Sequence, residues 1–254
     1  MTSIEGAIME ESDGSLARVD RPRSNLEGSC SYLANRSCLG TLRKVTQPRD
    51  ESRVDDVVFV REDDPRCADL EGRGYAITGY SWGANLRFDD DSDLSPIQDR
   101  VESMSIEGLI IRELLGDDLV AVVVLESANA IDYPSSPAAR HGAPSVESLT
   151  AQLDGGARAW GALVFGELVA ATLVAPHDER WNTEFTSVLP AFRGNGIGAA
   201  VKAASIVALY CAGVRWFSTG GAETNSASLG ANVALGYVLE PRWRTYSRRS
   251  PAAE

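Results

Sequence analysis

The chain has 254 residues, of which 44% are hydrophobic, so it can bury a core in one large domain or in two of ordinary size. Its 24 basic and 36 acidic residues give a formal net charge of -12, and a field of that sign opposes binding to nucleic acid or to an anionic membrane. The four cysteines have no CxxC spacing and only two histidines accompany them, so we expect no metal site and no disulfide framework.

The same features bear on compartment and partners. The first residues lack the charged, apolar and small-residue segments of a signal peptide, and no apolar run is long enough to span a bilayer. Together with the scattered cysteines, this favours a reducing compartment, the cytoplasm. The acidic balance suits a cationic partner such as a small-molecule amine, with no nucleic acid and no membrane among the partners. The sequence is compatible with a monomer or a homodimer.

In the first part of the chain, regular patterns begin only after residue 53. Residues 1–50 are polar and irregular, although LARVD and SCSYLANRSCL could each form a short strand or helix. The segment VDDVVFV predicts a strand, DDPRCADLEGRGY a helix that ends at Gly74, and AITGYSWGANLRF one or two strands. The acidic segment DDDSDLSPIQD is a candidate linker between domains, although a charged loop within one domain has the same composition.

The second half alternates more regularly. IEGLIIREL predicts a strand, GDDLVAVVVLESANA a helix despite its valines, and SVESLTAQLDGG a helix that Ser145 caps and two glycines end. ARAWGALVFGELVAATLVA predicts a β-hairpin that turns at Phe165-Gly166-Glu167, and WNTEFTSVL predicts the next strand. IGAAVKAASIVALYCAG predicts the longest helix, and a strand (VRWFSTG), a helix (NSASLGANVALGY) and a strand (WRTYS) follow it.

Two segments of the chain share one pattern, a helix that ends at Gly-Tyr and an aromatic strand after it. The segments are LEGRGYAITGYSWGANL, with Gly74-Tyr75 and Trp82, and NVALGYVLEPRWRTYSR, with Gly236-Tyr237 and Trp243. We interpret them as a tandem repeat whose first copy keeps its last third and lacks a glycine loop. Chance similarity is the alternative, because Gly-Tyr after a helix is a common stop.

The stretch PAFRGNGIGAA places glycines between a predicted strand and the longest predicted helix. The first turn of a helix has unpaired N–H groups and a partial positive charge, and glycines let an anion approach that backbone closely. A P-loop would need Gly-Lys-Ser/Thr here, and a dinucleotide fingerprint counted from Gly194 would need glycine at 199. Both motifs fail, which leaves either another kind of phosphate loop or a plain flexible connection.

The stretch TSVLPAFRGNGIGAAVKAA, followed after a strand by AETNSASLGANVALGY, resembles the GNAT superfamily of acyl-CoA-dependent N-acyltransferases. The shared features are an Arg/Gln-x-x-Gly-x-Gly/Ala pyrophosphate motif and an Asn-rich helix that ends in Leu-Gly-Tyr. The resemblance is specific over residues 157–247, weaker over 106–156, and earlier confined to 54–88. It implies an α/β fold with a central, mostly antiparallel, splayed sheet flanked by helices. It also implies a tandem protein, with a degenerate copy in residues 1–100 and a GNAT domain in 101–254.

The resemblance implies a binding site for acetyl-CoA. The backbone of Val188 and Leu189 would hydrogen-bond the pantetheine arm. The backbone amides that would hold the pyrophosphate are those of Arg193, Gly194, Asn195, Gly196, Ile197, Gly198 and Ala199. Asn225 matches a position whose side chain contacts the pantetheine, although an N-cap role would equally explain an asparagine there.

The resemblance also implies chemical roles. Glu184 matches a position where several GNAT members carry a catalytic base, and strand alternation puts it on the same face as Val188, although a merely solvated glutamate is the alternative. The polar loop of His177, Asp178 and Glu179 would hold a cationic substrate or be solvated. Many GNAT enzymes carry an acid tyrosine at the position of Asn232. Water, or Tyr237 or Tyr210, would have to replace that tyrosine.

We therefore expect an acetyl-CoA-dependent N-acetyltransferase that acts on the primary amine of a small molecule, such as an amino-sugar, an amino-acid derivative or an amine-bearing natural product. One alternative is acetylation of a protein N-terminus or lysine. Another is a non-catalytic acyl-CoA-binding sensor, in which the acyl group orders the two halves without being transferred.

Overall fold

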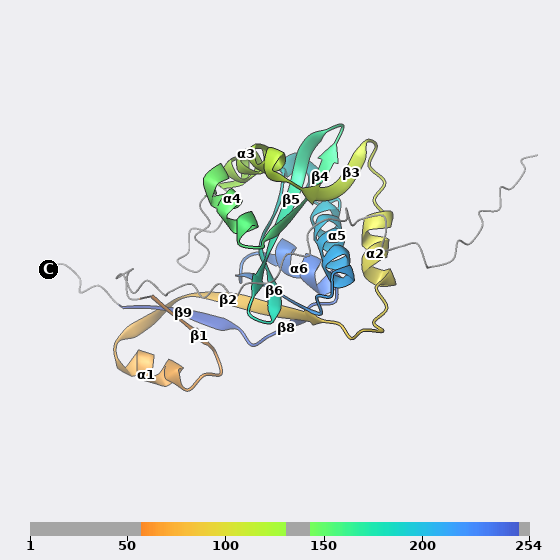
Figure 1. Ribbon diagram of the computed structural model, residues 1–254. Helices are drawn as coiled ribbons and strands as arrows, with labels where there is room; N and C mark the ends of the chain where they lie inside the picture. The colour runs from red at the N-terminus through yellow and green to blue at the C-terminus, as the bar shows by residue number, and fades with distance from the viewer. Residues whose placement is uncertain (1–56, 131–142, 249–254) are drawn as a thin grey trace, which may run out of the picture.

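The computed structural model describes residues 57–130 and 143–248, and nine strands from these ranges form one sheet (Figure 1). The strands are β1 (Val57–Arg61), β2 (Tyr75–Arg87), β3 (Leu109–Leu114), β4 (Arg158–Val164), β5 (Glu167–His177), β6 (Arg180–Val188), β7 (Trp216–Ala222), β8 (Val238–Leu239) and β9 (Trp243–Arg248). Their order is β1-β9-β2-β7-β6-β5-β4-β3, and β8 pairs with β2. Every pairing is antiparallel except that of β6 with β7. The mostly antiparallel α/β sheet that the sequence predicts is confirmed.

Helices cover both faces of the larger part of this sheet. The helices of the described ranges are α1 (Arg66–Gly72), α2 (Ser95–Glu102), α3 (Leu119–Asn129), α4 (Val146–Asp154), α5 (Ile197–Cys211) and α6 (Ser226–Ala234), with short 3-10 turns at Gly116–Asp118 and Pro190–Phe192. Figure 1 shows α3 and α4 on one face, and α5 with α2 beside it on the other. Val122 and Leu125 of α3 pack with Leu149 of α4 against buried residues of β4, β5 and β6. This packing explains why α3 is helical despite its valines. None of the helices in the described ranges is long and apolar enough to cross a membrane.

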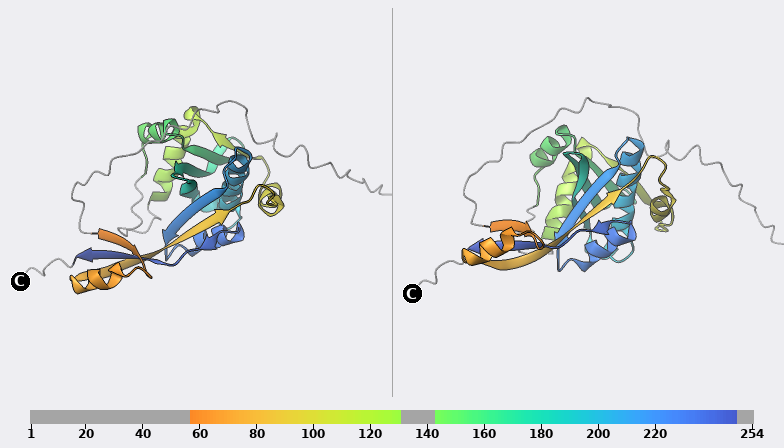
Figure 2. Two further views of the ribbon diagram at one scale, coloured as in Figure 1. Left: turned by 60° about the horizontal axis from the view of Figure 1, so that its bottom comes forward. Right: turned by 90° about the horizontal axis from the view of Figure 1, so that it is seen from below.

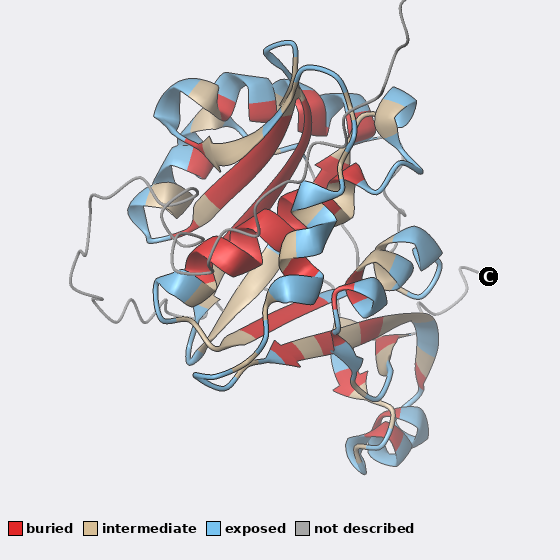
Figure 3. Cartoon of the chain, turned by 90° about the vertical axis from the view of Figure 1, so that its right-hand side faces the viewer, coloured by how far each residue is buried: buried red, intermediate tan, exposed pale blue. Residues whose placement is uncertain are grey.

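The helix α5 lies in the centre of the molecule, where Figure 3 shows it almost wholly buried. Small residues such as Ala203 and Ala204 line it and are fully buried against the sheet. An alanine-rich helix approaches a sheet closely, so α5 begins directly beside the end of β6. Its position therefore fixes where the glycine loop meets the strands.

The sheet continues from this body into a ribbon of β1, β9 and β2, which Figure 2 shows extending to one side. The order β1-β9-β2-β7 alternates segments from the two ends of the chain. β1 pairs with β9 over five positions, and β2 pairs with β7 over seven. α1 packs on the ribbon over a small core that contains Leu70, Tyr75 and Tyr246. Two strands from residues 57–87 thus alternate in the sheet with two strands from residues 216–248.

Most predicted elements are present. The hairpin between β4 and β5 turns at Phe165 and Gly166, which have positive φ angles of 50° and 89°. The segment AITGYSWGANLRF forms one strand, β2, with a register shift between Ile77 and Gly79. LARVD and SCSYLANRSCL lie outside the described residues.

Two expectations differ from the structure. The candidate linker is only partly a loop, because Ser95–Glu102 forms α2, with proline in its first turn, and α2 packs on α5. Residues 100 and 101, between which the sequence analysis places the boundary of the two halves, both belong to α2, and the division into halves stays a prediction. Cys211 is disulfide-bonded, whereas the cysteine spacing gave no reason to expect a disulfide, and Cys67 is a buried free thiol.

Candidate active site

The parallel strands β6 and β7 separate soon after they meet. They pair only at Trp181 with Phe217 and at Asn182 with Ser218. Beyond these pairs they enclose, together with β2, a cleft of about 540 Å³. A cleft of this volume is large enough for a small ligand. The residues that line the cleft include Thr183, Glu184, Thr186, Thr219, Asn225 and Glu240.

At the open end of the cleft, the backbone of Val188 faces away from β5. The Leu189 N–H donates to Val169 O at 2.9 Å, so Val188 and Ala170 form the kind of pair that exchanges no hydrogen bonds. The amide groups of Val188 therefore point toward the β7 side. Both backbone groups of Leu189 are engaged, because its carbonyl accepts from Phe192 N at 2.9 Å. Of the two predicted residues, Val188 is the one whose N–H points away from β5, at the end of the strand that lines the cleft up to Thr186.

The glycine loop adopts the backbone that its sequence suggests. Gly194 and Gly196 have φ angles of +78° and +79°, in the left-handed region that non-glycine residues avoid. Gly196 is the N-cap of α5, and the first bond of the helix runs from Ala200 N to Gly196 O at 3.0 Å. The N–H groups of the first turn, residues 197–199, lie before that bond and have no partner within the helix. Unpaired N–H groups at the start of a helix are of the kind that can bind an anion, and the pyrophosphate site stays a prediction.

Gly198 allows the start of α5 to pack closely against the end of β6. A Cβ atom built at Gly198 would lie 3.0 Å from Val188 Cγ2 and 3.7 Å from Thr186 Cγ2. Thr186 itself lines the cleft. The absence of a side chain at residue 198 therefore lets the first turn of α5 pack directly on the end of β6, beside the cleft.

The side chain of Arg193 is held by protein groups. Its Nε donates to Val188 O at 2.9 Å, and its NH2 group donates to Asn129 Oδ1 at 2.7 Å. Asn129, buried at the end of α3, also donates to Ser187 Oγ at 2.7 Å and to Val188 O at 3.2 Å. Asn129 thus fixes both the end of β6 and Arg193. Sequence reasoning missed Asn129, because it lies 58 residues before its partner Ser187 and no local pattern indicates that the two residues are in contact.

Asn225 is the N-cap of α6, which is one of the two roles that the sequence analysis considers for it. Its side-chain oxygen accepts from Ser228 N at 3.1 Å. Asn225 also lines the cleft. Capping does not preclude a contact with a ligand, because the oxygen can accept a second hydrogen bond and the amide nitrogen has two N–H donors.

Glu184 lines the cleft and is exposed to solvent. It stands at an irregularity in the β5–β6 register, which passes from Leu173–Phe185 to Val174–Thr183 and leaves Glu184 opposite no residue. Such a bulge turns a side chain away from strict alternation. Asn182 Nδ2 donates to the Glu184 carboxylate at 3.1 Å, and Ser218 Oγ donates to Asn182 Oδ1 at 3.0 Å. This chain of contacts orients Glu184.

A second carboxylate, that of Glu240, enters the cleft from the segment between β8 and β9. Asn85 Nδ2 donates to it, and its backbone N–H donates to Gly83 O at 2.9 Å. A Cβ atom on Gly83 would lie 3.0 Å from Glu240 Oε2, so the glycine makes room for the carboxylate. Trp243 also lines the cleft, as does Phe59 of β1. Sequence reasoning missed Glu240, since only the pairing of β2 with β7 and β8 brings it to the cleft.

Asn232, at the position where the sequence resemblance implies an acid tyrosine, is buried and faces a lysine. Lys202 Nζ donates to Asn232 Oδ1, and to Thr219 Oγ1 at 3.1 Å. The ring of Tyr237 lies 4.9 Å from the same ammonium group. Burial lowers the pKa of Lys202 from 10.5 to about 7. The sequence does carry a signal for this group, a single lysine in the apolar run GAAVKAASIVAL.

Neither tyrosine named from the sequence reaches the cleft lining. The hydroxyl of Tyr210 donates to the carbonyls of Asp89 and Asp90 at 3.1 and 2.9 Å. Tyr237 is buried, and burial raises the pKa of its hydroxyl far above the usual value.

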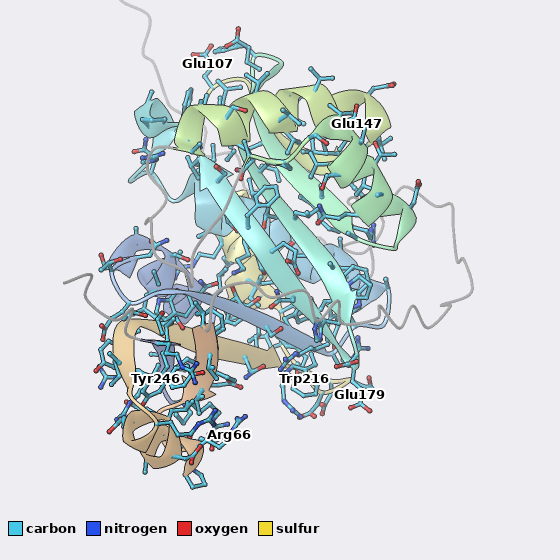
Figure 4. All side chains as sticks on the ribbon, turned by 90° about the vertical axis from the view of Figure 1, so that its left-hand side faces the viewer. Arg66, Glu107, Glu147, Glu179, Trp216 and Tyr246 are labelled. Carbon is cyan, nitrogen blue, oxygen red and sulfur yellow. The ribbon has the colours of Figure 1, made fainter. Side chains whose placement is uncertain are left out.

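The polar loop before β6 is the tip of the β5–β6 hairpin. His177 Nδ1 lies 3.4 Å from Asp178 Oδ2, and both side chains are largely exposed. Figure 4 marks Glu179 at this tip and Trp216 at the start of β7. Arg180, the next residue, lines the cleft.

Comparisons with known proteins agree on the fold. No protein-family model matches the sequence, and no curated protein sequence does. A GCN5-related N-acetyltransferase from Sphaerobacter thermophilus superposes with a TM-score of 0.59 at 16% identity, over 76% of this chain and 60% of that one. A tandem GNAT protein from the clavulanic acid biosynthesis pathway gives 0.56 at 22% identity, over 78% and 65%. A GNAT-family acetyltransferase from Colwellia psychrerythraea gives 0.52 at 15% identity, over 75% and 64%.

These comparisons confirm that the chain has the GNAT fold, as its sequence resemblance implies. The chain spans 60% and 65% of the length of the first two relatives.

Proposed function

We propose that the protein is an acetyl-CoA-dependent N-acetyltransferase that acetylates the primary amine of a small molecule. The observation that carries this proposal is the cleft where β6 and β7 separate, with the glycine loop packed on the end of β6 beside it. Backbone N–H groups at the start of α5 suit a pyrophosphate. The N–H of Val188 suits an acyl carbonyl or the amide of an extended arm. Gly198, which has no Cβ atom, lets the first turn of α5 pack closely on Val188 at the end of β6.

The chemistry needs few side chains. A neutral amine attacks the thioester carbonyl carbon, the C–N bond forms, the C–S bond breaks, and the amine loses a proton. Holding the two reactants together supplies much of the acceleration. In this proposal, Val188 N–H stabilises charge on the carbonyl oxygen. Glu184, which Asn182 orients, removes the ammonium proton of the acceptor.

The test is turnover of acetyl-CoA by the purified protein with a library of small amines, followed as release of free thiol. Release with at least one small amine supports the proposal. Binding of coenzyme A without release from any amine or peptide would favour the sensor instead, and release with peptides alone would favour protein acetylation. No binding of coenzyme A would contradict all three.

Gly196→Ala is expected to raise the dissociation constant of coenzyme A at least tenfold. A residue with a side chain disfavours φ +79° by roughly 1–2 kcal/mol, so the loop relaxes and its amides rotate away from the pyrophosphate. Gly213→Ala is the matched control, because Gly213 has φ +97° at the other end of α5. Calorimetric titration with coenzyme A should show weaker binding in the first variant alone. Equal affinity in both variants would contradict a role for the loop.

The walls of the cleft favour a cationic acceptor. Glu184 and Glu240 are its acidic lining residues and Arg180 is basic, while Phe59 and Trp243 add aromatic surface. An alkylammonium group gains from both carboxylates and aromatic faces. This supports a small amine over a neutral acceptor.

Glu240→Gln is expected to raise the KM for the best amine about tenfold, because a hydrogen bond to a charged group contributes roughly 1.5–3 kcal/mol. The dissociation constant of coenzyme A should not change. Glu107→Gln, at an exposed site remote from the cleft (Figure 4), serves as control. An unchanged KM in Glu240→Gln would remove Glu240 from the acceptor site.

We further propose that the chain arose by tandem duplication and that residues 1–100 include the remnant of the first copy. Gly74 and Gly236 end equivalent helices with φ angles of +84° and +87°, and each precedes a buried tyrosine. In the order β1-β9-β2-β7, the strand β2 after α1 pairs with β7 before α6, and the longer strand β9 after α6 pairs with β1 before α1. A reciprocal exchange of last strands between two copies would produce this order.

A chain truncated to residues 101–254 is expected not to fold, because it lacks β1 and β2. Loss of β2 removes the seven pairs with β7 and exposes the edges of β7 and β9. A chain of residues 57–254 keeps both strands and should unfold cooperatively in thermal circular dichroism. Cooperative unfolding of the shorter chain would show that the exchanged strand is dispensable.

A further inference from the structure

Lys202 is a charged residue buried in the middle of the apolar helix α5, directly behind the cleft. Its side chain is buried between α5, β7 and α6, and its ammonium group contacts Thr219 Oγ1, Asn232 Oδ1 and the ring of Tyr237. A buried lysine destabilises a protein unless its charge is compensated. No carboxylate contact of Lys202 occurs among the described residues, so ion pairing does not account for its position.

Thr219 connects this lysine to the cleft. It is the first residue of β7 after Ser218, which makes the last pair with β6, so it stands where the two strands begin to separate. It lines the cleft, and its hydroxyl accepts from Lys202 Nζ at 3.1 Å. A hydroxyl that accepts from an ammonium group still has its own proton to donate. The Thr219 hydroxyl is therefore the group between Lys202 and the narrow end of the cleft.

We propose that Lys202, acting through the Thr219 hydroxyl, supplies the proton that the leaving thiolate takes up when the acetyl group is transferred. This inference rests on the proposed acetyltransferase function. Lys202 is a positioning and proton-supplying residue behind the cleft, and Thr219 is the group that touches the thiolate. Asn232 holds the Lys202 ammonium by a side-chain contact, in a position where a tyrosine would itself be the acid.

The proton balance closes. As the C–S bond breaks, the thiolate takes the proton of Thr219 Oγ1, and Thr219 takes one from Lys202 Nζ, which becomes a neutral amine. The acceptor nitrogen loses its protons to Glu184 and then to water. Lys202 regains a proton from water before the next cycle. One proton is released for each amide and thiol formed.

The environment of Lys202 suits this transfer. Its pKa is about 7 because of burial, whereas a thiol has an ordinary pKa of about 8.5, so the transfer runs downhill. Among the described residues packed around it, β7 presents the Thr219 hydroxyl, α6 presents the Asn232 amide, and Tyr237 is the titratable group. Burial raises the pKa of Tyr237, so it stays neutral while Lys202 titrates.

The test compares Thr219→Val with Thr219→Ser in the full chain, using thiol release and the pH dependence of kcat. Loss of the hydroxyl is expected to lower kcat roughly 100-fold near pH 7, and serine should restore most of it. In the parent, kcat should fall as pH rises through the range where Lys202 loses its proton. That limb should disappear in Thr219→Val and in Lys202→Met. Coenzyme A should bind the parent and Thr219→Val equally in calorimetry.

The outcomes separate this inference from the proposed function. If the parent turns over amines and Thr219→Val matches it in kcat and pH profile, the proton route is wrong while the acetyltransferase stands. If the parent releases no thiol with any amine, both are overturned. Lys202→Met confirms the source of the proton where it folds, and Thr219→Val, which leaves the lysine in place, decides the question where it does not.

Discussion

Glu184→Gln is expected to lower kcat/KM for amine acetylation by roughly 100-fold near neutral pH, the usual effect of losing a general base. The glutamine keeps the shape of the side chain and its neighbour Asn182, whose amide can still make a hydrogen bond. What disappears is the proton acceptor. Since a primary amine loses its proton spontaneously at high pH, the deficit should shrink as pH approaches the pKa of the acceptor. Thiol release measured from about pH 6 to pH 10 checks both parts.

Glu179→Gln is the matched control for this variant. Glu179 lies in the turn between β5 and β6, beyond the residues that line the cleft (Figure 4). The substitution Glu179→Gln removes a carboxylate charge, as Glu184→Gln does, from a nearby part of the surface. Equal losses in both variants would mean that general electrostatic attraction of the amine, and not proton removal, explains the effect. No loss in Glu184→Gln would leave proton removal to water.

The backbone of the glycine loop could be predicted from sequence because its information is local. Glycine is strongly favoured where φ is positive, as at Gly194 and Gly196, and a glycine can be recognised directly in the sequence. The end of the preceding strand and the start of the helix are equally local. The loop, the hairpin at Phe165-Gly166 and the long buried helix all depend on neighbours within a few residues.

Contacts that only the tertiary structure creates could not be predicted. Asn129 acts on β6 from α3, and Glu240 reaches the cleft because β2 lies between β9 and β7. Glu184 shows a subtler limit. Strict alternation predicted its direction, but the residue stands at a bulge, and its orientation depends on Asn182 and Ser218.

Lys202 could be recognised as unusual from the sequence, but its contacts could be found only in the structure. The sequence shows a charge in an apolar helix, which conflicts with the rule that buried positions are apolar. Conflicts of this kind are expected at functional sites, where stability is given up for chemistry. Only the structure shows that the ammonium group lies against Thr219, at the separation of β6 and β7.

The cost of burying that lysine should be measurable in the whole protein as a dependence of stability on pH. The pKa of Lys202 is lowered to about 7 in the folded state, against 10.5 in the unfolded chain. Between these values the unfolded state binds more protons, so the free energy of unfolding rises with pH. Below about pH 6 both states hold the proton, and the full penalty is present.

We therefore expect Lys202 to contribute an increase of about 2–3 kcal/mol in the free energy of unfolding between about pH 6 and pH 9. Urea unfolding of the parent and of Lys202→Met at matched pH values isolates this contribution, because other groups titrate alike in both proteins and cancel in the difference. The difference should favour Lys202→Met most at pH 6 and diminish toward pH 9. A difference that does not change with pH would mean that Thr219, Asn232 and Tyr237 together compensate the ammonium charge fully, and a lysine so compensated would not give up its proton to a thiolate at neutral pH.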